Sequence, residues 1–440
     1  MNDTLNISSS ETQRNNKVEV IPKEIKFAFW LLCCCFAMWG LANNMTDVLI
    51  AQFRKVFTLT DMQSGLVQTA FYGAYFCLAL PAALFIQRYS YKAGVLLGLG
   101  LFATGALLFY PAAQAMEYLP FLLALFVLAG GLSILETSAN PYILAMGPEE
   151  TATRRLNIAQ ACNPIGSITG VLIGKFYILS QLNPATDSER AAMAADELAK
   201  IQSDELYAVM MPYMGVAVVI ALIWLLILKT KMPAAKDTST TGESTFGQAY
   251  RCIVKRSHFT KGVLAQFFYV GAQIGCWSWT IRYVMQEVGG TEAEASTYLL
   301  TSIVIFSVMR WVCVALMKHI EPQKLLAALA AIAAILVAVI MVVGGLAGAY
   351  ALVGVSACMS LMFPTIFGLS LRDLGSDSKF GGSFLIMAIL GGALLTAIMG
   401  QISDAAGIGA AFVIPFIGFV YLVYYGAKGY QVKNYPQGQH

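Results

Sequence analysis

The stretch 27-FAFWLLCCCFAMWGLANNMT-46, followed directly by Asp47, decides the fold class of this chain. Twenty residues without a charge are long enough to cross a bilayer as one α-helix. A simple anchor does not need the two amides, the hydroxyl and the carboxylate with which this run ends. At about 100° per residue, Trp39, Asn43 and Asp47 share one face of the helix. Hydrocarbon cannot solvate such a face, so we expect it to face protein or a water-filled cavity.

The composition indicates that many more such runs follow. Of the 440 residues, 58% are hydrophobic and only 12% are charged, far from the average of soluble proteins. The ten-residue alternation of a membrane β-barrel is absent from the sequence. The predicted class is an all-α integral membrane protein with the lipid bilayer as its surroundings. The net charge of +3 is scattered over short loops, so we expect no nucleic-acid partner.

Charge-free runs predict twelve transmembrane helices. The run 325–371 has 47 residues, enough for two spans, and 344-GGLAG-348 is the expected turn between them. The runs are 27–46, 62–87, 93–116, 118–135 continuing past Glu136, 156–174, 206–228, 262–281, 295–317, 325–371, 380–403 and 405–427.

The basic residues predict the orientation. With a cytoplasmic N-terminus, the inner loops hold fifteen Lys and Arg residues, and the outer loops hold four besides Lys175 and Arg282 at the outer ends of two spans. An even number of spans places both termini on the same side. We therefore expect a multi-pass protein with both termini in the cytoplasm.

A polar linker at 231–259 divides the chain into two bundles of six spans, 27–230 and 260–428, with cytoplasmic tails at 1–26 and 429–440. The halves resemble each other. Ile165-Gly166 matches Gly391-Gly392, and Asn140-Pro141 matches Phe363-Pro364 at nearly the same shift. Two six-helix pseudo-repeats in parallel are typical of the major facilitator fold, in which substrate binds between the halves.

Four motifs extend this interpretation: 43-NNMTD-47, 135-LETSANP-141, 155-RLNIAQ-160 and 270-VGAQIGCWS-278. With nearly colinear spacing from about Ile25 to Tyr425, the chain resembles bacterial L-fucose:proton symporters. Those belong to the fucose–galactose–glucose:proton branch of the major facilitators. The resemblance implies proton-coupled uptake of L-fucose or a closely related monosaccharide by alternating access, across a bacterial inner membrane. It also implies that Asp47 carries the proton and that Glu136 lies near the substrate.

The two acids also have a physical interpretation. A charged carboxylate at bilayer depth costs about 3 kcal/mol on insertion scales, which favours a protonated form. Asp47 and Glu136 are therefore candidate proton-coupling residues, and Glu136 can also accept hydrogen bonds from sugar hydroxyls. The alternatives are structural: Asp47 satisfied by water or Arg54 at a helix end, and Glu136 bound to a neighbouring Arg or amide.

Polar faces on other spans supply candidate substrate-binding residues. Asn140 lies one turn beyond Glu136, and span five carries Gln160 and Asn163 on one stripe. These amides can bind hydroxyls, or they can simply link helices. In span seven Gln266, Gln273 and Trp277 nearly superpose on one face. An aromatic ring beside amides suits a pyranose, and Trp39 is the expected opposite wall.

Remaining features set limits on function. Arg310, inside span eight, is predicted as a gating or structural charge that pairs with an acid or an amide. The histidines His258, His319 and His440 lie in loops or the tail, so no membrane-depth dyad or metal site is expected. None of the nine cysteines has zinc-ligand spacing. No phosphate-binding loop is present either.

We therefore expect no enzyme activity, no metal and no cofactor besides the proton as coupling ion, and a monomer. Phe363 stands where the resemblance suggests a tyrosine, so glucose or galactose remains an alternative sugar. A sugar sensor with a transporter fold and an intramembrane enzyme are disfavoured by the short tails and by the histidine positions.

Overall fold

The computed structural model describes residues 19–56, 61–115, 117–178, 192–233 and 246–432, together with 181, 183, 185, 189 and 190. Every regular element in these ranges is a helix. The predicted linker residues 234–245 and the predicted tail residues 1–18 and 433–440 lie outside this part of the chain.

The first half contains the six spans predicted for it. The short helices η1 (Lys23–Ile25) and η2 (Glu149–Thr151) precede the first and the fifth span. The spans are α2 (Lys26–Val56), α3 (Asp61–Arg88), α4 (Tyr91–Ala115), α5 (Tyr118–Ala145), the series α6 (Ala152–Gln160), α7 (Asn163–Ile173) and η3 (Gly174–Ile178), and α9 (Ala195–Lys229).

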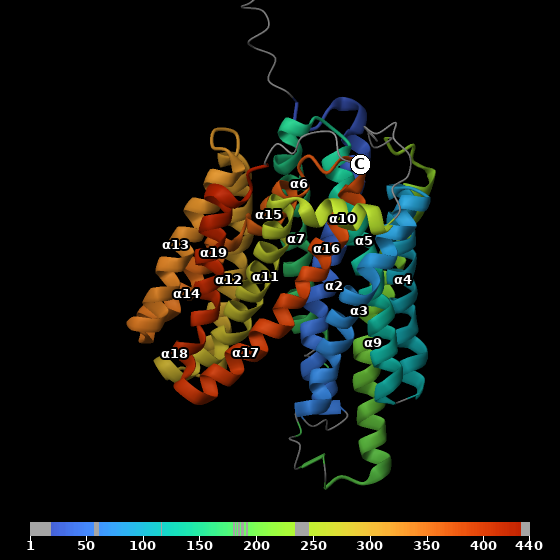
Figure 1. Ribbon diagram of the computed structural model, residues 1–440. Coiled ribbons are helices and arrows are strands. Elements are labelled where there is room, and N and C mark those ends of the chain that lie inside the picture. Colours follow the sequence, from blue (N-terminus) through green and yellow to red (C-terminus); the bar gives the residue numbers. More distant parts are fainter. Residues whose placement is uncertain are drawn as a thin grey trace, which may run out of the picture.

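The second half begins with α10 (Phe246–Lys255), which lies across one end of the bundle (Figure 1). Cys252, predicted in a loop, lies on this helix. The six spans are α11 (Ser257–Tyr283) with η5 (Val284–Val288); α12 (Glu292–Leu316); α13 (Pro322–Val342); α14 (Gly345–Met359) with α15 (Met362–Ser370); η6 (Gly375–Asp377), α16 (Ser378–Met387), η7 (Ala388–Leu390) and α17 (Gly391–Ala406); and α18 (Ile408–Ala411), α19 (Val413–Tyr424) and η8 (Tyr425–Gly429).

The prediction of twelve transmembrane helices in two halves is confirmed. Within the described part of the chain, ten segments are long and apolar enough to cross a membrane by length and composition alone. The other two are α6–η3, which is interrupted after Gln160, and α11, whose amides lower its hydropathy. The predicted turn between α13 and α14 is also confirmed. Gly344 and Gly345 both have positive φ, 66° and 55°, a backbone conformation that glycine adopts without strain.

Two spans break before a proline. The break after α6 comes shortly before Pro164, and the break after α14 comes shortly before Pro364. Proline interrupts a helix in this way because it has no N–H to continue the helical hydrogen bonds. The carbonyls four residues earlier, those of Gln160 and Ser360, lose their helical partners. A break of this kind leaves a polar backbone group at membrane depth that another residue must satisfy.

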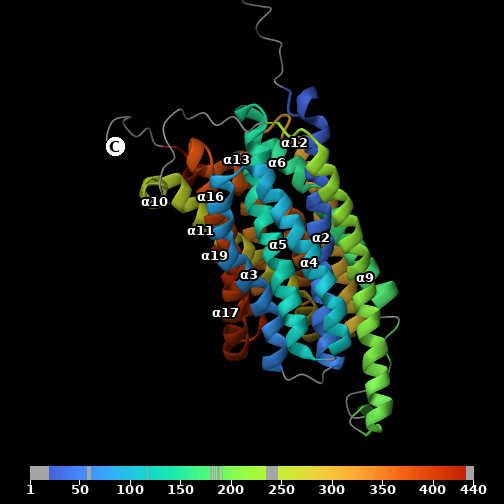
Figure 2. The ribbon, with the colours of Figure 1, turned by 90° about the vertical axis from the view of Figure 1, so that its right-hand side faces the viewer.

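The two halves lie side by side, and the start of α2 and the end of α19 are at the same end of the molecule (Figure 1). We call this the terminal end. α9 extends beyond the other helices at the opposite end (Figure 2). The halves contact each other through α3 and α5 against α16, and through α6 against α15. Near the terminal end Asn157 donates to Thr365 across the halves, with 3.2 Å between Nδ2 and Oγ1.

Candidate functional site

A cavity of about 90 Å³ lies between the two halves. Eight helices contribute to its wall: α2, α3, α6, α7, α11, α12, α15 and η7. The lining residues from the first half are Trp39, Asn43, Asn44, Phe71, Tyr72, Tyr75, Gln160, Asn163, Pro164 and Ser167. Those from the second half are Val270, Gln273, Ile274, Trp277, Ile303, Phe306, Arg310, Phe363 and Ile389.

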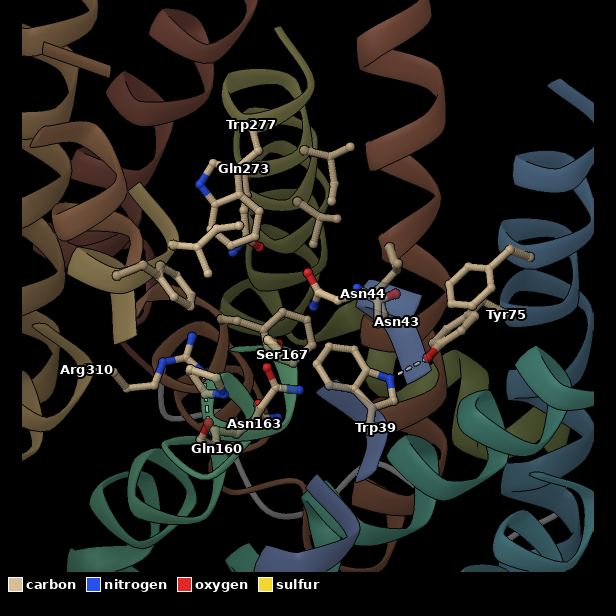
Figure 3. A pocket seen from close by; sticks show the side chains of 18 of the residues that line it. Trp39, Asn43, Asn44, Tyr75, Gln160, Asn163, Ser167, Gln273, Trp277 and Arg310 are labelled. Carbon is tan, nitrogen blue, oxygen red and sulfur yellow. Dashed lines mark hydrogen bonds between the residues drawn. The ribbon is translucent and has the colours of Figure 1, made fainter. Parts of the chain in front are cut away.

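The two walls differ in chemistry. The first half contributes three asparagines, a glutamine, a serine and two tyrosines, whereas most of the second-half residues are aliphatic or aromatic. Trp39 and Trp277 lie on opposite walls (Figure 3). Trp277 is held in place because its Nε1 donates to Ser356 Oγ at 3.1 Å and its ring meets Phe306 edge-on. A cavity of this kind suits a neutral molecule with one apolar face and a rim of hydroxyls.

Glycines bring α2 and α7 close enough to share the polar wall. A Cβ at Gly166 would lie 1.7 Å from the carbonyl oxygen of Ala37, and one at Gly40 would lie 2.2 Å from that of Asn163. Real side-chain carbons do not approach backbone atoms so closely, so only glycine permits this packing. Asn163 Nδ2 donates to the Phe36 carbonyl at 3.3 Å, which further ties the two helices.

A buried carboxylate lies behind this wall. Glu136 on α5 is only 2% exposed and does not line the cavity. Trp39 Nε1 donates to the hydroxyl of Tyr75, with 2.5 Å between the two atoms. The Tyr75 hydroxyl in turn donates to Glu136 Oε1 at 3.4 Å. The other carboxylate oxygen, Oε2, has no hydrogen-bond partner among the described residues. The Tyr75 hydroxyl therefore links the cavity-lining Trp39 to a carboxylate at membrane depth.

Asn140 also lies one layer behind the wall. Its Oδ1 accepts from Gln160 Nε2 at 2.9 Å, and Gln160 lines the cavity. The Nδ2 of Asn140 is buried and has no partner in the described part of the chain. Asn140 thus orients Gln160 rather than lining the cavity itself.

Arg310 connects the two halves at the cavity wall. Its Nε donates to the Ser360 carbonyl, with 2.5 Å between the atoms, and its Nη1 donates to the Gln160 carbonyl at 3.0 Å. These are the two carbonyls that Pro164 and Pro364 deprive of helical partners. The ends of α6 and α14, one from each half, thus bring two negative helix termini to one guanidinium. The sequence led us to expect an acid or an amide side chain as partner, and the structure shows main-chain carbonyls instead.

The structure places most of the predicted site residues at this cavity. Trp39, Asn43, Gln160, Asn163, Gln273, Trp277 and Arg310 line it. Glu136 and Asn140 lie directly behind it. Gln266 does not belong to this wall: it is fully buried, and neither amide atom has a hydrogen-bond partner among the described residues. It lies seven residues, about 10 Å, from Gln273 along α11, so it shares the face but not the depth.

The side chain of Asp47 lies outside the described residues, although its backbone continues α2. Its predicted role as a proton carrier stays a prediction.

Tyr75, whose hydroxyl contacts both Trp39 and Glu136, was not among the predicted site residues. The signal was the run Phe71-Tyr72-Gly73-Ala74-Tyr75 inside an apolar span, where Phe71 and Tyr75 are one turn apart. Aromatic residues are common in membrane helices, so this run alone does not indicate a site. The role of Tyr75 becomes visible only when α3 is placed next to α2, which carries Trp39, and α5, which carries Glu136.

The sequence profile of the Major Facilitator Superfamily matches residues 32–393. The chain belongs to this superfamily. It is 41% identical over 395 residues to the L-fucose-proton symporter of Escherichia coli (strain K12), a match that covers 89% of this chain and 90% of the relative. It is 34% identical over 410 residues to the glucose/galactose transporter of Brucella abortus biovar 1 (strain 9-941), covering 92% of this chain and 95% of that one.

Among solved structures, the superfamily transporter FucP in the outward conformation matches with a TM-score of 0.86 and 40% sequence identity. That match covers 91% of this chain and 98% of FucP. The major facilitator fold predicted from the two six-helix repeats is thereby confirmed. These relatives are transporters, which also confirms the prediction that the chain is not an enzyme.

Proposed function

We propose that this chain is a proton-coupled symporter that takes up L-fucose, or a closely related monosaccharide, by alternating access. The observation that carries the proposal is the cavity between the halves, whose two chemically different walls lie in front of a buried carboxylate. The 41% identity to an L-fucose-proton symporter over nearly the whole length of both chains supports the same substrate class.

The chemistry of a 6-deoxyhexose matches the two walls. Such a sugar has an apolar face of C–H groups, a methyl group and a rim of hydroxyls. Asn43, Gln160 and Asn163 can donate to and accept from the hydroxyls. Trp39 and Trp277 can cover the apolar faces of the ring. Phe363, on the second-half wall, adds apolar surface that suits the methyl group. This division assigns substrate binding to residues from both halves, as alternating access requires.

The proton-coupling role is assigned to Glu136 together with Asp47. Among the described residues, no cationic side chain is hydrogen-bonded to Glu136, and one of its oxygens has no partner. Protonation of a carboxylate in this setting is favoured, because burying the neutral acid costs much less free energy than burying the ion. Loading a proton from outside and releasing it inside would couple sugar movement to the proton gradient.

The proposal also covers the membrane, the orientation of the chain in it and the oligomeric state. The terminal end carries the basic residues Arg88, Lys92 and Arg155, which favours a cytoplasmic position for that end of the molecule. We place the chain in a bacterial inner membrane with both termini inside. We further propose that a monomer suffices, because the two halves of one chain supply both walls of the cavity, and that the proton is the coupling ion, with no metal and no cofactor.

A glucose or galactose transporter is the second candidate. It is favoured by the 34% identity to the Brucella glucose/galactose transporter. Both sugars carry a hydroxymethyl group where L-fucose has its methyl group. Burying that hydroxyl against an apolar wall without a partner is unfavourable, which ranks these sugars behind L-fucose.

The test is uptake into proteoliposomes that contain the purified protein. With an imposed inward proton gradient we expect L-fucose to accumulate, and unlabelled L-fucose to compete better than D-galactose or D-glucose. Without the gradient the sugar should only equilibrate. Accumulation that follows a sodium gradient and ignores pH would contradict the coupling assignment, and preferential uptake of D-glucose would replace the substrate.

A further inference from the structure

Three side chains from three helices form a continuous chain of hydrogen bonds from the cavity wall to the buried acid. They are Trp39 on α2, Tyr75 on α3 and Glu136 on α5. Figure 3 shows the indole of Trp39 turned toward the hydroxyl of Tyr75 at the edge of the cavity. Trp39 is also a wall residue of the cavity, so it can touch both the substrate and the chain.

The directions of these hydrogen bonds follow from the groups involved. An indole N–H can only donate, and a phenol has one hydrogen to give. Because Trp39 donates to the Tyr75 oxygen, the Tyr75 hydrogen is available for Glu136. The backbone around Tyr75 is anchored as well: Ser133 Oγ of α5 donates to the Tyr75 carbonyl at 3.0 Å. Tyr75 therefore has a fixed position between the cavity and the acid.

We propose that Tyr75 is a positioning residue through which the sugar at Trp39 and the proton at Glu136 influence each other. The proposal rests on the proposed function. An ionised carboxylate accepts a hydrogen bond about twice as strong as a neutral one does. It also polarises the Tyr75 hydroxyl and strengthens the bond from Trp39, as in other hydrogen-bond chains. The ionised state of Glu136 thus holds the Trp39 N–H away from the cavity.

Protonation of Glu136 has the opposite effect. The bond from Tyr75 becomes a weaker neutral one, and the Trp39 N–H can turn to a sugar hydroxyl. Because coupling between two binding events is reciprocal, a sugar that takes the Trp39 N–H also favours the protonated acid. Sugar and proton then bind more tightly together than apart, which is the thermodynamic requirement of a symporter.

Other charged groups near this chain are few. α5 packs against α2, α3, α4, α6 and α16. The described charged side chains of those helices lie at helix ends: Lys26, Arg88, Lys92, Arg154, Arg155 and Lys379. Tyr72 is a second tyrosine close to Tyr75 on α3. Asp47 on α2 and Asp61 at the start of α3 are the remaining carboxylates, and their side chains lie outside the described residues. The test must therefore separate Glu136 from Asp47.

The first experiment needs no sugar. The protein is labelled with 5-fluorotryptophan, and the Trp39 ¹⁹F resonance is assigned from its loss in Trp39→Phe. We expect this resonance to move with pH in the wild type and to stay fixed in Glu136→Gln, whose amide oxygen still accepts from Tyr75. Tyr75→Phe should also fix it, because the bridging hydroxyl is gone. Tyr110→Phe, which removes an exposed hydroxyl on α4 outside the cavity wall, is the control and should keep the movement.

The second experiment measures L-fucose binding by calorimetry at acidic and at alkaline pH. The wild type should bind at least about fivefold more tightly at acidic pH, the lower end of ordinary coupling. In Tyr75→Phe the ratio of the two affinities should approach one, and in Tyr110→Phe it should stay at the wild-type value.

A Trp39 resonance that ignores pH in the wild type overturns the proposal. So does one that titrates unchanged in Glu136→Gln or in Tyr75→Phe. If the protein binds no L-fucose, the proposed function fails, and the resonance alone still decides the role of Tyr75.

Discussion

Arg310 should stabilise the molecule by satisfying two carbonyls that proline leaves without partners. Replacing it by methionine keeps an apolar stem of similar length and removes both hydrogen bonds, to Ser360 and to Gln160. Each bond from a charged donor is worth about 1.5–3 kcal/mol. Removing a buried charge returns part of its desolvation cost, so we expect a net loss of about 2 kcal/mol.

The structure offers a way to show that the carbonyls cause this loss. In the background Pro164→Ala with Pro364→Ala, new backbone N–H groups can reach the Gln160 and Ser360 carbonyls. Arg310→Met should then cost at least about 1 kcal/mol less than it does in the wild type, measured as a double-mutant cycle.

The assay is unfolding of the purified protein in detergent, followed by heat or denaturant for all four combinations. An equal loss in both backgrounds would refute the reasoning, because Arg310 would then act through something other than the two carbonyls. No loss at all in Arg310→Met would refute it as well.

Three further predictions address packing, substrate contact and orientation. Gly166→Ala forces a Cβ against the Ala37 carbonyl and should destabilise the protein by about 1–3 kcal/mol in the same unfolding assay, whereas Gly215→Ala, with no atom within 4 Å, should be neutral or slightly stabilising. Trp277→Ala should weaken L-fucose binding about tenfold by calorimetry, and Trp277→Phe less, if the ring covers the sugar. Exposed Cys252 on α10 should react with a membrane-impermeant maleimide only after spheroplasts are permeabilised, with Cys252→Ser as background; labelling of intact cells would reverse the orientation.

The architecture could be predicted because a bilayer restricts what a chain can do. Charge-free runs of sufficient length must be helices there, and the glycine pair at Gly344 and Gly345 supplies the turn in the longest run. Hydropathy alone would have missed α11, since Gln266 and Gln273 lower its score. The absence of charges from 262 to 281 predicted it nevertheless.

The cavity could be predicted only in part. Helical-face arithmetic brought Gln273 and Trp277 to the same wall, and Trp39 to the opposite one. Such arithmetic gives the angular position of a side chain around its helix but not its depth in the membrane. It therefore could not show that Gln266 lies beyond the cavity. Contacts between helices could not be predicted from the sequence either. The residues around Glu136 do not indicate that its partner is Tyr75, because Tyr75 lies 61 positions away in the chain.

The partners of Arg310 could more nearly have been predicted from the sequence. Pro164 and Pro364 each stand four residues after a carbonyl that the structure shows bound to the guanidinium. A buried arginine was expected to need an acid, because charges are usually compensated by charges. Two helix C-termini provide an alternative that becomes visible only when α6 and α14 are placed next to α12.

The most direct measurement of the central claim is proton movement caused by the sugar itself. Proteoliposomes with an internal pH indicator and no imposed gradient receive external L-fucose. The account predicts internal acidification with the wild-type protein. It predicts none when Glu136→Gln and Asp47→Asn are combined. Sugar entry without acidification in the wild type, or acidification that persists in the double variant, would contradict it.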